Sequence, residues 1–149
     1  MKGLRRRRRE RPERSKVAQK LIKLTGIGAE FTSVLSTEGL ARDFRNRRQA
    51  GSFAGLTSMP WISGQLDHEQ GVSKSGNPRL RTTMIQLAWL WPTHQPDTKL
   101  AHWYKDRLAN ASGRGAKQKL VVALARKLFV ALCKYVAFGE LIEGAVMKA

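Results

Sequence analysis

Two glycines that flank one aliphatic residue, Gly26 and Gly28, mark the first stretch of the sequence that could bind a ligand. Glycine allows a tight turn between short helices, and the backbone N–H groups at the start of the second helix then point outward. Such a helix start attracts phosphate without help from side chains. Because Lys16, Lys20 and Lys23 lie just before the turn, the segment predicts a phosphate-binding helix-hairpin-helix. An ordinary helix turn with a capping glycine is the alternative.

Several serines lie close to basic residues in the segment 57–76. A serine hydroxyl can attack a phosphate when a base or a metal ion activates it and positive groups surround the phosphate. Lys74, Arg79 and Arg81 could supply that charge, and the glycine after Ser63 would let the backbone approach a phosphate closely. Residue type alone does not choose among the serines, and a loop serine that caps a turn is the alternative. The candidates are Ser58, Ser63, Ser73 and Ser75.

Groups that could hold a metal ion are few. Asp67, His68 and Glu69 are adjacent in the chain, and three adjacent side chains rarely converge on one ion, so a solvated loop is the better interpretation. His94 and His102 are interpreted as surface or packing residues. The sequence therefore predicts no metal site and no cofactor in this chain.

The four tryptophans invite a base-stacking interpretation. Trp89 and Trp91 lie on a segment with a clear apolar face, and Trp103 lies on another, so core packing explains most of them better. Trp61 falls in the segment 57–76 and is the exception that could stack on a base.

The charge balance is strongly basic, with 28 Lys and Arg against 11 Asp and Glu, a net charge of +17 and a pI near 11.1. Such an excess points to a polyanion, either nucleic acid or an anionic membrane surface. Ten of the cationic residues lie in the first 20, including five consecutive arginines. We expect residues 1–15 to be a disordered arm that binds any phosphate backbone with strong salt sensitivity. A solubilising leader is the alternative.

The apolar runs and the cysteine content bound the class of protein further. Arg126 and Lys127 split the longest apolar runs, so no membrane span is predicted, and we expect a cytoplasmic protein without a membrane partner. The single cysteine, Cys133, excludes an intramolecular disulfide and a cysteine-rich zinc site. We expect it to be an inert core residue.

The hydrophobic pattern predicts an all-α fold without strands. Residues 16–40 form the predicted helix-hairpin-helix, in which Ile27 fills the core. Residues 41–149 form a small helical domain that contains the stretch 57–76. That stretch has no helical or strand period and is interpreted as a long functional or disordered loop.

After this loop, Asn77 and Pro78 predict a helix start, with Asn as the N-cap and Pro at the first helical position. Pro92 and Pro96 are expected to bracket a break. Two more helices follow, at about 97–110 and at 116–137. The last is apolar nearly all round, which predicts a central core helix.

A set of short motifs occurs in one order along the chain: Phe44-Arg45-Asn46-Arg47-Arg48, Ala54-Gly55-Leu56, Ser63-Gly64, Gln70 to Asn77, Leu87-Ala88-Trp89-Leu90-Trp91, Gln95-Pro96-Asp97 and Glu143-Gly144-Ala145. Over roughly residues 17–149, they resemble the C-terminal domain of insertion-sequence transposases that carry an N-terminal RuvC-like DEDD domain. This is the "one-ten" family, related to Piv-type invertases. The ordered signature disfavours an unrelated basic structural protein, such as one associated with ribosomal RNA.

The resemblance implies a DNA recombinase with two half-sites. One is a DEDD carboxylate cluster that holds divalent metal, and we expect Mg²⁺ there and not among the 11 scattered acidic residues of this chain. The other is a serine nucleophile, which the resemblance places at Ser63. It also implies DNA and a structured guide RNA from the element as partners, and a homo-oligomer stays open.

The resemblance also bears on activity. We expect no activity without a DEDD domain, supplied in trans or by a longer protein. A transposon remnant that only binds DNA or RNA is the alternative.

The residues predicted to bind nucleic acid lie in the hairpin turn, in the basic stretch before residue 49 and beside the long loop. They are Lys23, Gly26, Gly28, Arg45, Arg47, Arg48, Lys74, Asn77, Arg79 and Arg81.

Overall fold

The computed structural model describes residues 15–40, 47–56 and 77–148. The predicted basic arm, apart from residue 15, and the predicted long loop lie outside the described residues. Arg45, Ser63 and Lys74 lie outside them as well, so their roles stay predictions.

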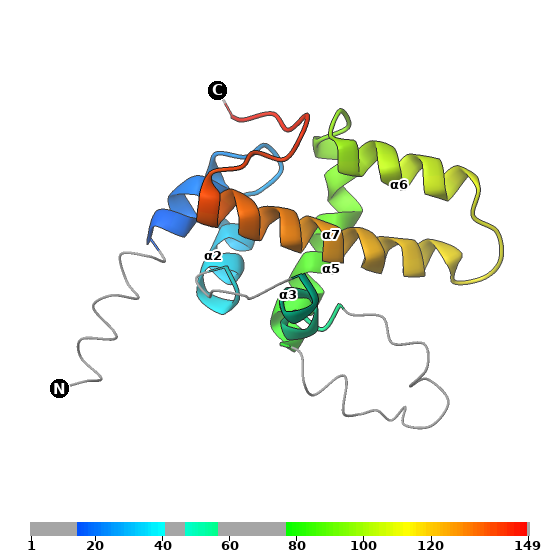
Figure 1. Cartoon of the computed structure of the whole chain (residues 1–149), viewed down its shortest axis with the longest axis horizontal. Coiled ribbons are helices and arrows are strands. Elements are labelled where there is room, and N and C mark those ends of the chain that lie inside the picture. The colour runs from blue at the N-terminus through cyan, green and yellow to red at the C-terminus, as the bar shows by residue number, and fades with distance from the viewer. Residues whose placement is uncertain (1–14, 41–46, 57–76, 149) are drawn as a thin grey trace.

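Every regular element among the described residues is helical, which confirms the all-α prediction (Figure 1). Residues 15–22 are helical and lead into the turn that contains the two glycines. An isolated antiparallel bridge joins Leu24 to Met147. The named helices that follow residue 22 are α2 (Ala29–Glu38), α3 (Arg47–Phe53), α5 (Pro78–His94), α6 (Lys99–Ala109) and α7 (Ala116–Phe138).

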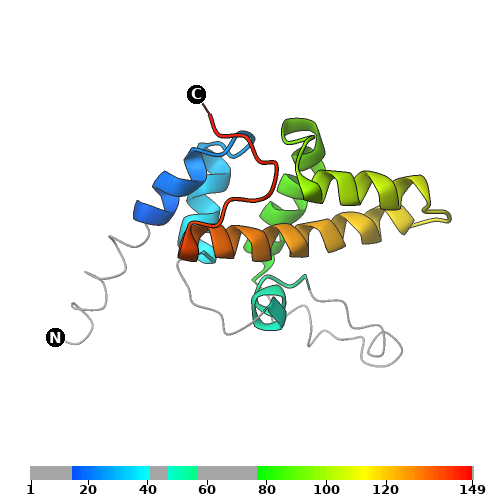
Figure 2. The same ribbon diagram turned by 45° about the horizontal axis from the view of Figure 1, so that its top comes forward.

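Helix α7 runs through the middle of the molecule and packs against α3, α5 and α6 (Figures 1 and 2). Helix α6 lies antiparallel beside it, because the turn at 110–115 reverses the chain. Burying a Leu or Phe side chain stabilises the fold by about 1.5–3 kcal/mol, so α7 contributes much of the core energy. Its buried residues are Val121, Leu124, Ala125, Leu128, Phe129, Leu132 and Tyr135. The prediction of a central core helix is confirmed.

Cys133 lies half-buried on this helix and is a free thiol. Burial raises the pKa of this thiol to about 12, because the thiolate would be poorly solvated there. The thiol therefore stays protonated and unreactive at neutral pH, as expected from the sequence.

Helix α5 begins as the sequence predicts. The side-chain oxygen of Asn77 accepts from the backbone N–H groups of Arg79 and Leu80, each at 3.1 Å, and Pro78 needs no partner at the first helical position. The apolar face of this helix is buried throughout. It consists of Leu80, Met84, Leu87, Ala88 and Trp91.

The expected break between Pro92 and Pro96 is present. Helix α5 continues through Pro92 and ends at His94, where the N–H of Gln95 closes the last turn on the Trp91 carbonyl at 2.7 Å. Pro92 removes one backbone hydrogen bond, and the packing of the buried Trp91 side chain keeps the helix intact across it. The expectation that Trp89 packs in the core was wrong. It is 43% exposed, because it lies on the opposite side of the helix from the buried face.

The C-terminal segment folds back onto the hairpin turn, which is the turn of residues 23–28 before α2. The side chain of Gln95, which is fully buried, joins the two. Its Nε2 donates to the carbonyls of Thr25 at 2.8 Å and Val146 at 2.9 Å, and its Oε1 accepts from the N–H of Val146 at 2.8 Å. The N–H of Lys148 also donates to the carbonyl of Lys23 at 2.7 Å. Helix α5, the hairpin turn and the C-terminal segment are thereby held together.

Candidate nucleic-acid interface

The hairpin turn has the predicted buried centre, but its two glycines are not equivalent. Ile27 is fully buried, as expected. Gly26 has a φ of +94°, and a Cβ there would come within 2.8 Å of the His94 Cβ. Gly28 has an ordinary φ of −91°, and a Cβ there would meet nothing within 4 Å. The turn therefore requires glycine at Gly26 only, in contrast to the expectation that both glycines shape it.

The charges around this turn are mixed. Gly28 is the N-cap of α2 and forms no side-chain capping bond, so the start of that helix is open to an anion. Lys23 is exposed beside it, and the ammonium of Lys148 donates to the Ile27 carbonyl at 2.9 Å. Glu30, however, lies in the first turn of α2 and opposes an anion there. Phosphate binding by Lys23, Gly26 and Gly28 stays a prediction.

A matched pair of substitutions separates the folding and binding roles of the turn. Gly26→Leu should lower the free energy of unfolding by about 2–3 kcal/mol. The leucine would have to adopt a left-handed backbone conformation, and its Cβ would overlap with the Cβ of His94. Gly28→Leu should cost less than about 1 kcal/mol and still obstruct the approach of a phosphate to the backbone. Urea unfolding and DNA titration of both variants check this. A folded Gly28→Leu variant with unchanged DNA affinity would remove the turn from the binding site.

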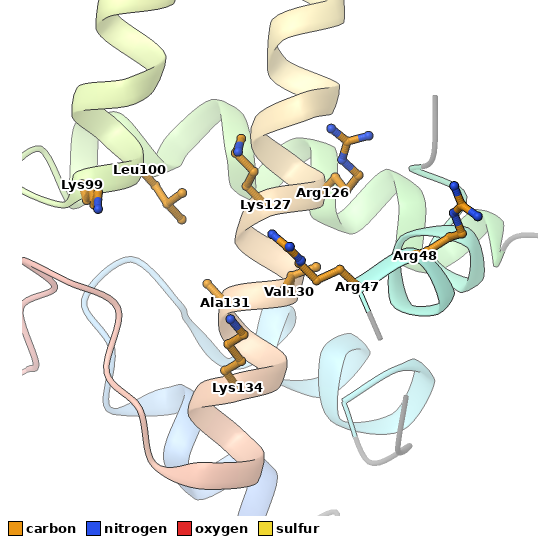
Figure 3. Close-up of a pocket in the computed structure, with 9 residues that line it drawn as sticks. All are labelled: Arg47, Arg48, Lys99, Leu100, Arg126, Lys127, Val130, Ala131 and Lys134. Atoms are coloured by element: carbon orange, nitrogen blue, oxygen red, sulfur yellow. The ribbon is translucent and has the colours of Figure 1, made fainter. Parts of the chain in front are cut away.

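A groove of about 720 Å³ opens where α3, α6 and α7 meet (Figure 3). We call it the basic groove, because six of its nine lining residues are cationic. Arg47 extends from α3 across Val130 of α7, while Leu100 points from α6 towards Lys127 (Figure 3). The lining residues are Arg47, Arg48, Lys99, Leu100, Arg126, Lys127, Val130, Ala131 and Lys134.

The electrostatics of the basic groove favour a polyanion. No acidic side chain lines it among the residues that the structure describes. Glu143 lies 3.8 Å from the ammonium of Lys99, but the side chains are 79% and 78% exposed, so water screens this pair and leaves Lys99 available. Six neighbouring cations repel one another, and a bound phosphate chain would relieve that repulsion.

The structure brings two of the predicted binding residues, Arg47 and Arg48, into the basic groove. Sequence reasoning missed the other four cations, Lys99, Arg126, Lys127 and Lys134. A signal for part of this set exists, since residues 126, 127, 130, 131 and 134 recur at helical spacing on one face of α7. The approach of α3 and α6 to that face depends on tertiary packing, which the spacing does not reveal.

Three further predicted residues lie together at a separate place, the start of α5. Both ends of the Asn77 side chain are engaged, because its oxygen caps α5 and its Nδ2 donates to Glu38 at 2.9 Å. Arg79 lies 3.5 Å from the same carboxylate, and the Nε of Arg81 donates to the Gly55 carbonyl at 3.0 Å. Arg79 and Arg81 remain exposed. These contacts stabilise the entry to α5, and nucleic-acid binding there stays a prediction.

The comparison with protein families bears directly on this arrangement. The family model described as "Transposase IS116/IS110/IS902 family" matches residues 18–102, which is more than half of the chain. The chain belongs to this family. The match includes the hairpin turn, α3 and α5 and ends within α6, so it contains Arg47, Arg48 and Lys99 of the basic groove.

Two curated relatives agree with this membership of the IS116/IS110/IS902 transposase family. "Putative transposase y4rJ" of Sinorhizobium fredii is 60% identical over 128 residues, covering 86% of this chain and 32% of the relative. "Transposase for insertion sequence element IS1328" of Yersinia enterocolitica is 26% identical over 126 residues, covering 83% of this chain and 38% of the relative. The chain thus spans about a third of the length of these relatives. No solved structure matches it significantly.

Within residues 15–40, 47–56 and 77–148, no group of three or more His, Cys, Asp or Glu side chains could hold a metal ion. None of the helices described there is both long and apolar enough to cross a membrane.

Proposed function

We propose that this chain is a DNA-binding domain of an insertion-sequence transposase and that it binds the phosphate backbone of DNA in the basic groove. The observation that carries the proposal is the convergence of six cations from three helices on one groove. Membership of the transposase family makes DNA the expected polyanion.

Ion release would drive this binding. Each phosphate that the protein neutralises releases condensed counterions, so the logarithm of affinity falls with the logarithm of salt concentration by about 0.9 per contact. Such contacts carry no sequence information, so we expect the isolated chain to bind duplex DNA with little sequence preference. The cationic residues near the N-terminus add to the positive charge that attracts DNA. The basic groove adds cations that are held at fixed positions by the fold.

Neutralising two groove cations tests the proposal. The double variant Arg126→Gln/Lys134→Gln should reduce the salt slope by about 1.8 and weaken binding at low salt by about tenfold or more, because two phosphate contacts are lost. The measurement is fluorescence anisotropy of a labelled duplex at several salt concentrations.

The matched control removes the same number of charges from exposed positions outside the groove. Lys105→Gln/Lys119→Gln should leave the slope nearly unchanged, since Lys105 on α6 and Lys119 on α7 do not line the groove. Equal losses in the two double variants would show that net charge, and not the groove, determines binding.

We further propose a catalytic contribution from the segment that precedes α5. On the resemblance, Ser63 is the nucleophile, a DEDD domain with Mg²⁺ supplies the second half-site, and a structured RNA of the element guides the complex. The N–H of Asn77 donates to the Phe53 carbonyl at 2.8 Å, so the described residues on either side of 57–76 are held together. Exposed Arg79 and Arg81 lie at that junction and add positive charge.

A further inference from the structure

Trp103 of α6 lies at the margin of the basic groove. The ammonium of Lys127, which lines the groove, lies 4.9 Å from the centre of the Trp103 ring, and the Arg107 guanidinium lies 5.7 Å from it. Leu100 also lines the groove and precedes Trp103 by three positions, so the two side chains share one face of α6. The tryptophan is half-buried and packs against the core, which fixes its ring in place.

The floor of the basic groove is apolar. Leu100 of α6 and Val130 and Ala131 of α7 line it between the cations, and each is only partly buried. A phosphate backbone alone gains nothing from such a floor, whereas the sugars and bases of an unpaired strand do. A cationic channel combined with an aromatic ring is the combination that binds single strands without sequence preference.

We propose that the basic groove binds an unpaired DNA strand in preference to duplex DNA, and that Trp103 stacks on one of its bases. This inference rests on the proposed function, because the phosphates of the strand would bind the same cations. Lys127 and Arg107 are exposed, flexible side chains. When a strand binds, they move from the ring to its phosphates, and a base takes their place on the ring.

The relative strengths of the two contacts favour this exchange. An exposed contact between a cation and an aromatic ring changes an equilibrium by a factor of about two to five. Stacking of a base on an aromatic side chain changes it by a factor of about five to more than a hundred. The displaced cations also gain phosphate partners. Both the stacking of the base and the new contacts of the cations therefore favour binding of the strand.

The test compares a labelled 20-nucleotide oligo(dT) with a 20-base-pair duplex at one salt concentration, by anisotropy. Trp103→Leu keeps an apolar side chain but removes the ring, and it should weaken oligo(dT) binding by about tenfold while changing duplex binding less than about twofold. Trp103→Phe retains a ring and should bind oligo(dT) within about threefold of the parent chain. Thermal melting confirms that each variant is folded.

Trp89→Leu is the matched control, because Trp89 is exposed and has a lysine, Lys117, 5.2 Å from its ring, but that lysine does not line the groove. It should leave both affinities unchanged. If Trp103→Leu does not fold, fluorescence provides the second measurement. Oligo(dT) should quench the emission of the parent chain more than that of Trp103→Phe, because the stacked tryptophan is then absent.

Three outcomes would overturn the inference. Equal losses on oligo(dT) and duplex would mean that Trp103 only positions Lys127. Unchanged affinities, or quenching that does not depend on Trp103, would exclude stacking. Binding of an oligo(U) RNA without binding of oligo(dT) would assign the groove to RNA. Failure of the proposed function is distinguishable, because it appears as an unchanged salt slope in Arg126→Gln/Lys134→Gln.

Discussion

Replacing Gln95 by Leu is expected to lower the free energy of unfolding by about 3 kcal/mol, the largest stability change that we predict. Leucine has a similar volume but cannot hydrogen bond. The substitution therefore leaves the carbonyl of Thr25 and the N–H of Val146 without the Gln95 partner, and the carbonyl of Val146 keeps only the N–H of Thr25 as a donor. Because Gln95 is fully buried, water does not reach its position without separating the C-terminal segment from α5.

Urea unfolding followed by circular dichroism measures this loss. Gln86→Leu is the matched control, because Gln86 lies on the same helix but is exposed, and it should change stability by less than about 0.5 kcal/mol. A similar small change for Gln95→Leu would contradict the prediction. It would mean that the Thr25 carbonyl and the Val146 N–H bind water as readily as they bind Gln95.

The parts of the fold that were predictable from the sequence depend on local physics. The start of α5 follows from two adjacent residues, because Asn77 accepts bonds from the N–H groups that the helix leaves free and Pro78 needs none. The core helix α7 follows from apolar residues repeated at three- and four-residue intervals. Neither inference needs any knowledge of distant residues.

The parts that were not predictable depend on contacts between distant residues. Gln95 joins Thr25, 70 positions earlier, to Val146, 51 positions later, and a polar residue between two prolines resembles an ordinary loop residue in the sequence. Gly26 and Gly28 looked alike for the same reason. His94 approaches only the first of them, and that approach is set by the packing of α5.

In the candidate site too, the features set by local sequence were predictable and those set by distant contacts were not. The sequence identified Arg47 and Arg48 as binding residues, because they belong to a short basic stretch of the chain. It did not identify Arg126 and Lys127, which were interpreted only as interruptions of an apolar run. In the folded chain, Arg126 and Lys127 lie opposite α3 and line the basic groove together with its arginines. That location depends on tertiary packing alone.

Ser63→Ala is expected to abolish the covalent protein–DNA adduct that the chain should form together with a DEDD domain and the RNA of the element. In the proposed step, the serine oxygen bonds to a DNA phosphate, the hydroxyl of the cleaved strand leaves, and the serine proton passes to solvent or to the leaving oxygen. Alanine has no oxygen to form this ester, so the loss should be complete. Denaturing electrophoresis of labelled DNA detects the adduct as a protein-linked band.

The rival serines provide the controls, because each removes one hydroxyl from the same stretch of the chain. Ser58→Ala, Ser73→Ala and Ser75→Ala should retain the adduct. Arg79→Gln should weaken adduct formation without abolishing it, because Arg79 is exposed beside the junction of Phe53 and Asn77 and would supply charge but no bond. DNA affinity is measured in parallel, and it should be the same for Ser63→Ala as for the parent chain, since one hydroxyl adds little to phosphate binding by a chain with a net charge of +17. An adduct that persists in Ser63→Ala, or that disappears in one of the other three serine variants, would assign the chemistry to a different residue.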